Sequence, residues 1–114
     1  HLAFLLGCRR YFETDNYLFF HANYDPELPP AEQPERLLFW EHLTVFDSGA
    51  HTIPGRHYSG KVAIVGHTPQ ESGEILDLGD VICIDTCFFG DGWLTALEVE
   101  SRQVWQADQH GRLR

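Results

Sequence analysis

Two histidines stand at positions from which a chain can bind a metal ion. His21 follows the apolar run 17–20, and His67 follows the apolar run 61–65 with only Gly66 between them. Imidazole is neutral near pH 7 and binds divalent metals through one ring nitrogen, while the other nitrogen is oriented by a nearby acceptor. Ligands also tend to collect where strands end. The pattern therefore predicts His21 and His67 as metal ligands.

The spacing of these two histidines leaves another interpretation open. They lie 46 positions apart and match no local zinc signature such as HExxH or CxxC. Two histidines that merely cap the ends of strands would give the same pattern.

The elements that must position these histidines are mostly strands. The aromatic run 17–20 and the β-branched run 61–65 are each too short for a helix, and the continuous apolar character of 61–65 predicts burial on both faces. The runs 74–78 and 81–85 flank Gly79 and Asp80, which predicts a hairpin. The runs 93–99 and 103–107 predict a second hairpin.

Two helices and two loops complete the predicted α+β fold. Apolar spacing indicates helices over 2–13 and over 34–43, the second opening with a proline, while 25–34 and 44–60 are predicted loops. His51 and His57 fall in the second loop, where no periodicity is present, and we expect both to face solvent.

Composition limits the functional class. The 114 residues suffice for one domain or part of one, and the net charge of −9 disfavours binding to nucleic acid or to anionic membranes. No apolar run approaches the ~20 residues of a membrane-spanning helix. The three cysteines form no CxxC pair, which fits a reducing compartment. These features predict a soluble, cytoplasmic protein.

Four segments, in order, resemble the calcineurin-like metallophosphoesterases, and among them the bacterial and phage serine/threonine protein phosphatases. Leu-Phe-Phe-His-Ala-Asn-Tyr-Asp-Pro resembles the segment in which a strand ends at a metal-binding histidine. Leu-Leu-Phe-Trp-Glu-His-Leu resembles the short tryptophan-containing helix of that family, and Val-Ala-Ile-Val-Gly-His-Thr-Pro resembles its Gly-His-Thr motif. Ile-Asp-Thr and Gly-Trp-Leu-Thr-Ala-Leu resemble its closing strands. The resemblance spans nearly the whole chain.

This resemblance implies a site with two divalent metal ions, manganese or iron and zinc, whose bridging water attacks phosphorus. His21 and His67 would bind the same one of the two ions. Relatives often carry an arginine after the tryptophan of the short helix, where this chain has Glu41 and His42. We expect His42 and Asn23 to contact the substrate, Tyr24 to lie at the same mouth, and Asp85 either to orient a ligand histidine or to cap a strand.

The other ligands of the family come from N-terminal motifs, Gly-Asp-x-His-Gly, Gly-Asp-x-x-Asp-Arg-Gly and Gly-Asn-His-Glu, and none occurs here. Residues 1–114 therefore read as the C-terminal portion of one metallophosphoesterase domain, half of a four-layer α/β-β/α sandwich whose N-terminal half is absent. Without the bridging aspartate, two neutral imidazoles cannot hold two cations close together. At most one partial metal site is expected, and the chain alone should be inactive.

The expected parent protein hydrolyses phosphoserine and phosphothreonine esters, and its partners are such phosphoproteins and the missing half of the domain. Symmetric dinucleoside tetraphosphatases share the histidine pair and remain an alternative. A non-catalytic interaction module that has kept the fold is a third. Because half of a sandwich would leave its sheet uncovered, we also expect exposed apolar strand faces over 62–65 and a tendency to aggregate.

Overall fold

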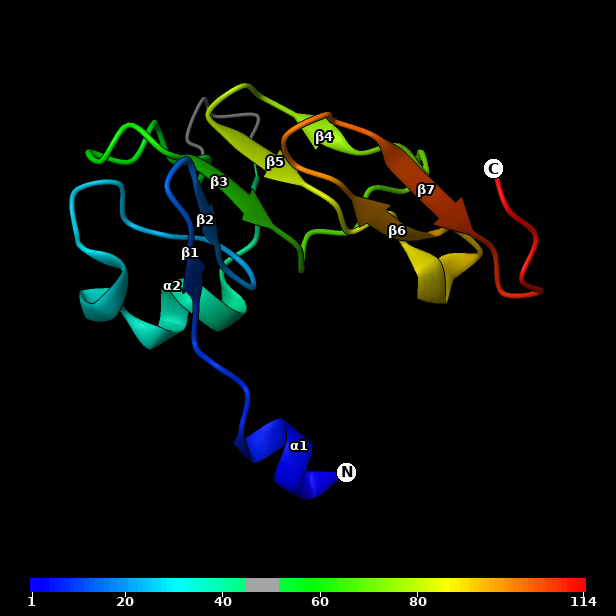
Figure 1. Cartoon of the computed structure of the whole chain (residues 1–114), viewed down its shortest axis with the longest axis horizontal. Helices are drawn as coiled ribbons and strands as arrows, with labels where there is room; N and C mark the ends of the chain where they lie inside the picture. Colours follow the sequence, from blue (N-terminus) through cyan, green and yellow to red (C-terminus); the bar gives the residue numbers. More distant parts are fainter. Residues whose placement is uncertain (45–51) are drawn as a thin grey trace.

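Short runs of β-branched and aromatic residues build a five-stranded sheet in the computed structural model, which describes residues 1–44 and 52–114. The sheet has the order β1-β2-β3-β5-β4. Its strands are β1 (Phe12–Glu13), β2 (Tyr17–Phe19), β3 (Val62–Val65), β4 (Leu76–Asp77) and β5 (Val81–Cys83). The predicted strands at 17–20 and 61–65 are confirmed, each one residue shorter than expected. Figure 1 shows β2, β3 and β5 side by side.

The three central strands run in the same direction. Leu18 pairs with Ala63 in the β2–β3 ladder, and Ile64 pairs with Ile82 in the β3–β5 ladder, both parallel. Parallel neighbours end at the same edge of a sheet, so the residues that follow β2, β3 and β5 meet there. This edge carries His21, His67 and Asp85.

Both predicted hairpins are confirmed. Strands β4 and β5 pair antiparallel around a turn in which Gly79 has a φ of 85°, a conformation that glycine adopts without strain. Strands β6 (Leu94–Leu97) and β7 (Val104–Ala107) form a separate two-stranded sheet.

The helices are shorter than their apolar spacing predicts. Helix α1 covers only Leu2–Leu6 and ends at Gly7, because the following chain extends and pairs as β1 with β2. The prediction of one helix over 2–13 was therefore wrong. Helix α2 covers Glu35–Trp40, with Pro34 as its N-cap. Two single-turn 3₁₀ helices, η1 (Pro30–Glu32) and η2 (Phe88–Gly90), interrupt the connecting loops.

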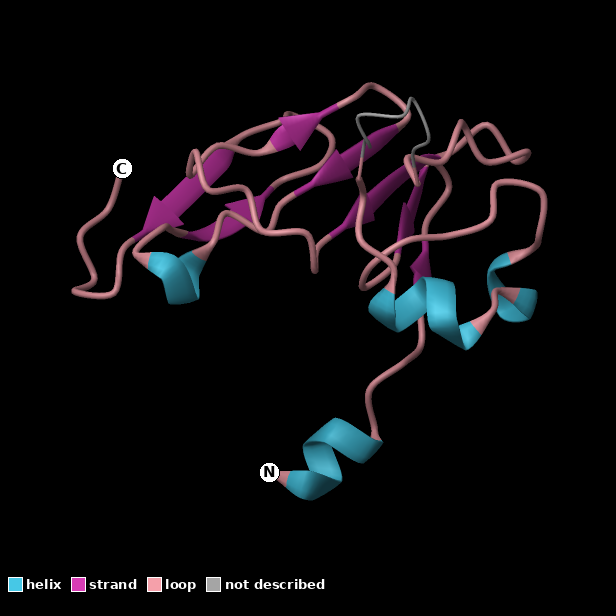
Figure 2. Cartoon of the chain, turned by 180° about the vertical axis from the view of Figure 1, so that it is seen from behind, coloured by secondary structure: helices cyan, strands magenta, loops and turns pink. Residues whose placement is uncertain are grey.

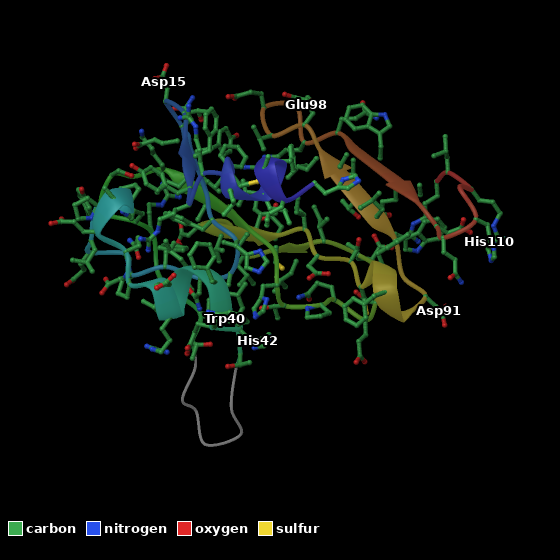
Figure 3. All side chains as sticks on the ribbon, turned by 90° about the horizontal axis from the view of Figure 1, so that it is seen from below. Asp15, Trp40, His42, Asp91, Glu98 and His110 are labelled. Atoms are coloured by element: carbon green, nitrogen blue, oxygen red, sulfur yellow. The ribbon has the colours of Figure 1, made fainter. Side chains whose placement is uncertain are left out.

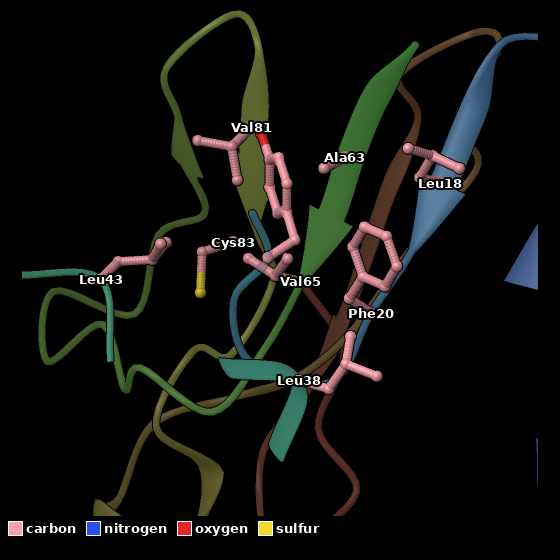
Figure 4. Packing of buried hydrophobic residues seen from close by; sticks show 9 residues of the cluster. Leu18, Phe20, Leu38, Leu43, Ala63, Val65, Val81 and Cys83 are labelled. Atoms are coloured by element: carbon pink, nitrogen blue, oxygen red, sulfur yellow. The ribbon is translucent and has the colours of Figure 1, made fainter. Parts of the chain in front are cut away.

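The core lies on both faces of the five-stranded sheet. Alternate strand residues such as Leu18, Ala63 and Val81 pack with Leu38 of α2 on one face (Figure 4). On the other face Tyr17, Ile64 and Ile82 form a second cluster, against which side chains at the start of the β6–β7 turn pack. The sheet is thus the middle of three layers, with α2 on one side and the β6–β7 turn on the other. Figure 2 shows the N-terminal helix apart from the strands and the other helical turns below them.

Burial of the strand faces contradicts one expectation. Ala63, Ile64 and Val65 have relative exposures of 0%, 4% and 2%, because α2 and the hairpin cover the sheet. Large apolar side chains are exposed instead on α1, where Phe4 and Leu6 are 78% and 77% exposed, and at scattered positions such as Phe89 and Leu113. Figure 1 shows α1 standing away from the rest of the chain.

The fold is accordingly α+β, with mostly strands and two short α-helices. In the part of the chain that the structure describes, no helix has the length and apolar character needed to cross a membrane.

Candidate metal site

The rings of His21 and His67 meet at the carboxyl edge of the central strands. Nε2 of His21 lies 3.2 Å from Nδ1 of His67, and the ring centroids are 4.9 Å apart. At this distance one nitrogen carries a hydrogen that the other accepts, and the tautomers decide which. The two residues that the sequence predicted as ligands are thus brought together from 46 positions apart.

The backbone between β3 and His67 fixes this approach. The Gly66 N–H donates to the carbonyl of His21 at 2.8 Å, which extends the β2–β3 pairing to the end of the site. His67 itself has a φ of 65°, in the left-handed region that non-glycine residues seldom adopt. Such a conformation turns the chain sharply after the strand and is typical of functional sites.

The segment after α2 is bound to the His67 loop. The Leu43 N–H donates to Oγ1 of Thr68 at 2.8 Å. The ring of His42 stacks on that of His67 with centroids 4.4 Å apart and an interplanar angle of 27°. Trp40 meets the same ring edge-on at 6.4 Å. His42, the predicted substrate contact, therefore lies at the site, and Figure 3 shows it beside Trp40.

A cleft opens next to the two histidines. It has a volume of about 560 Å³ and is lined by His21, Glu35, Phe39, Trp40 and His67. The indole of Trp40 is 70% exposed, which is unusual for so large an apolar side chain next to a polar site. Sequence reasoning missed Glu35 and Phe39, because only the fold turns that side of α2 towards the carboxyl edge of the sheet.

The charge state of His21 is set by its surroundings. Burial lowers its pKa below the ordinary 6.5, the neighbouring ring of His67 lowers it further, and the carboxylate of Asp85 acts in the opposite direction. The imidazole of His21 is therefore biased towards its neutral form, the form that binds a metal.

Asp85 follows β5 by two residues and caps that strand end. Its carboxylate accepts the Cys87 backbone N–H at 3.2 Å. Among the described residues it forms no hydrogen bond with either histidine. Of the two roles considered from the sequence, the strand cap is the one with a direct contact, while the charge of Asp85 reaches His21 through space.

The histidine pair fits part of the coordination shell of one ion. Nitrogen ligands bind such metals at about 2.1 Å, so two nitrogens on one tetrahedral or octahedral ion lie about 3.0–3.4 Å apart. The observed 3.2 Å falls in that interval. Within residues 1–44 and 52–114, however, no group of three or more His, Cys, Asp or Glu side chains is arranged to hold a metal. The pair could supply two ligands once the facing nitrogens carry no hydrogen.

Asn23, the other predicted substrate residue, is buried close to the site with an exposure of 2%. Its side-chain amide donates to the carbonyl of Thr52 at 2.7 Å, and its side-chain oxygen accepts the Tyr24 N–H at 2.8 Å. These bonds give Asn23 a clear role in holding the loop after β2. Substrate contact by Asn23 stays a prediction.

The expectation that His57 faces solvent was wrong. His57 has an exposure of 1%, with Nε2 at 2.8 Å from the carbonyl of Leu28 and Nδ1 at 2.8 Å from Oγ of Ser59. Its ring thus joins two loops that are distant in sequence. His51 lies outside the described residues.

No family model matches the chain, and no curated protein matches it either.

Proposed function

We propose that His21 and His67 bind one divalent metal ion and that the chain is part of a metal-dependent phosphoesterase of the calcineurin-like, serine/threonine phosphatase kind. The observation that carries this proposal is the 3.2 Å separation of the two ring nitrogens at the carboxyl edge of parallel strands. Four ordered segments that resemble the family add to it.

A bound divalent ion suits phosphoester hydrolysis, because the ion lowers the pKa of a water ligand and neutralises charge on the phosphoryl oxygens. The residues of this chain would hold and shield that ion. His21 and His67 are the ligands, the stacked ring of His42 restrains His67, and Phe39 and Trp40 line one side of the cleft.

In this proposal the chain forms one half of the catalytic domain. Here α2 and the sheet are the α/β layers of one half of the sandwich, and the β6–β7 turn covers part of the face that a second sheet would meet. A two-metal centre needs a bridging carboxylate and further ligands, and the described residues offer two imidazoles. The chain alone should therefore hydrolyse p-nitrophenyl phosphate no faster than buffer, and activity should require a segment carrying the aspartate motifs.

Phosphoserine and phosphothreonine esters are the substrates that the resemblance favours. One structural feature supports a second candidate, a symmetric dinucleoside tetraphosphate, because the exposed indole of Trp40 beside His67 offers a surface on which a base can stack. A panel of phosphopeptides and dinucleoside polyphosphates, assayed on a chain that includes the aspartate motifs, separates the two.

Metal binding by the chain itself tests the proposal directly. Isothermal titration calorimetry with Mn²⁺ should show one site, and His21→Gln or His67→Gln should weaken its Kd at least about tenfold, because each removes one of the ligands. His110→Gln is the matched control, since His110 is exposed and lies in the C-terminal tail. If the unaltered chain binds no Mn²⁺, or if all three variants behave alike, the non-catalytic interaction module becomes the better interpretation.

A further inference from the structure

An arginine from outside the resembling segments contacts the same phenyl ring as His21. In the antiparallel β1–β2 ladder Phe12 pairs with Phe19 and Glu13 with Leu18. The ladder ends at Phe12, and extending its register by two residues places Arg10 opposite His21. The packing supports the continuation, because Tyr11 and Phe20, the pair in between, belong to the same core cluster.

Phe39 connects the two side chains. The guanidinium carbon of Arg10 lies 5.8 Å from the centre of the Phe39 ring, within range of a cation–π interaction. The ring of His21 lies 6.4 Å from the same phenyl ring. Phe39 lines the cleft next to His21 and His67, and Arg10 itself lines a separate hollow formed by residues 9–13, so Phe39 is the residue through which the charge of Arg10 adjoins the cleft.

The guanidinium of Arg10 is also free to bind an anion. Among the described residues it has no ion pair and no side-chain hydrogen bond, whereas Arg36 on the neighbouring helix is paired with Glu41. A guanidinium presents five N–H donors in a planar fork that matches two oxygens of a phosphate group. The charged group lining the cleft, Glu35, is negative and would repel that ligand.

We propose that Arg10 binds the phosphate group of a phosphomonoester substrate, from the β1 side of the cleft, while the ester lies against His21 and His67. This inference rests on the proposed function for the identity of the ligand. It assigns the anion-binding role to the segment between α1 and β1, which is held by the short β1–β2 ladder, by Phe39 and by the packing of Tyr11 against the core.

Inorganic phosphate is the probe that tests this role. Calorimetric titration of the 114-residue chain with phosphate, with and without Mn²⁺, gives the phosphate Kd, and titration with Mn²⁺ alone gives the metal Kd. Arg10→Ala should weaken phosphate binding about tenfold, since a charged hydrogen-bonding group is lost, and Arg10→Lys should retain part of the affinity. Both variants should leave the Mn²⁺ Kd unchanged.

Arg9→Ala is the matched control, because it removes the same charge one residue away and should change the phosphate Kd less than twofold. Equal weakening by Arg9→Ala and Arg10→Ala would overturn the inference, since the effect would then be one of net charge. Absence of phosphate binding to the unaltered chain in both conditions would overturn it too. If the unaltered chain binds phosphate through Arg10 but binds no Mn²⁺, the proposed function is contradicted while the anion-binding role of Arg10 is supported.

Discussion

His21 lies between two neighbours with opposite effects on its proton. Burial and the ring of His67 both favour the neutral imidazole, whereas the carboxylate of Asp85 favours the protonated one. Because the pKa of His21 is lowered in the folded chain, the unfolded chain binds more protons at mildly acidic pH. The contribution of His21 to stability is therefore complete above about pH 6.5 and is lost as the pH falls through the folded pKa.

Two substitutions should move the pKa of His21 in opposite directions. His67→Gln removes a repelling ring and should raise it, while Asp85→Asn removes an attracting carboxylate and should lower it further. NMR titration of the His21 ring protons in metal-free protein measures both shifts. A shift of the same sign in both variants would contradict this account of the site.

The sequence predicts some site residues and misses others for a physical reason. His21 and His67 follow apolar runs directly, so each could be placed at a strand end without knowledge of the fold. The contacts of His57 could not, because the carbonyl that fixes its ring belongs to Leu28, 29 residues away, in a loop without periodicity. Arg10 is a similar case, since its proximity to Phe39 depends on the β1–β2 register.

At the scale of elements, the loop after β5 leaves no room for a side chain at Gly92. A Cβ atom there would lie 2.0 Å from the Thr86 carbonyl oxygen and 2.6 Å from that of Cys87. The Gly92 N–H also donates to the Cys87 carbonyl at 2.9 Å, which closes the loop tightly around η2. The entry of the chain into β6 thus depends on this glycine.

Gly92→Ala should lower the free energy of unfolding by about 1–3 kcal/mol, because backbone atoms would have to move. Gly55→Ala is the control: a Cβ there meets no atom within 4 Å and Gly55 does not have a positive φ, so its effect should be close to zero. Urea denaturation of the two variants gives the comparison. Similar midpoints for both would show that the loop can relax around the added methyl group.

Elements with a local signal were the ones that could be predicted. The hairpins are predicted by a glycine turn or a short polar turn between apolar runs, and β3 is predicted by its β-branched residues. The helix expected over 2–13 failed because its apolar spacing competes with pairing between Phe12 and Phe19, a contact that the spacing does not reveal. Tertiary pairing thus decided where α1 ends.

At the scale of the whole molecule, the buried core and helix α1 are separate parts of the chain. The core lies between α2, the five-stranded sheet and the β6–β7 hairpin, whereas none of the residues of α1 is buried. No pattern in the sequence predicts that α1 lies outside the core or that β5 is inserted between β3 and β4. The order of strands in a sheet is set by packing over the entire fold.

Deletion of residues 1–8 should change the free energy of unfolding by less than about 0.5 kcal/mol, since exposed side chains are removed. It should also reduce self-association, because contiguous exposed apolar groups promote it. Thermal melts and analytical ultracentrifugation measure the two effects. Leu38→Ala, which empties a core position with 1% exposure, is the control and should cost about 2–5 kcal/mol. A comparable loss on deletion would mean that α1 packs against the body.

The contact between β2 and β3 gives the histidine pair one more property. Any ion shared by two rings that are 46 residues apart would tie a long loop of the denatured chain, much as a covalent cross-link does. The free energy of metal binding would then also stabilise the fold. A chelator that removes the ion should therefore destabilise the central strands.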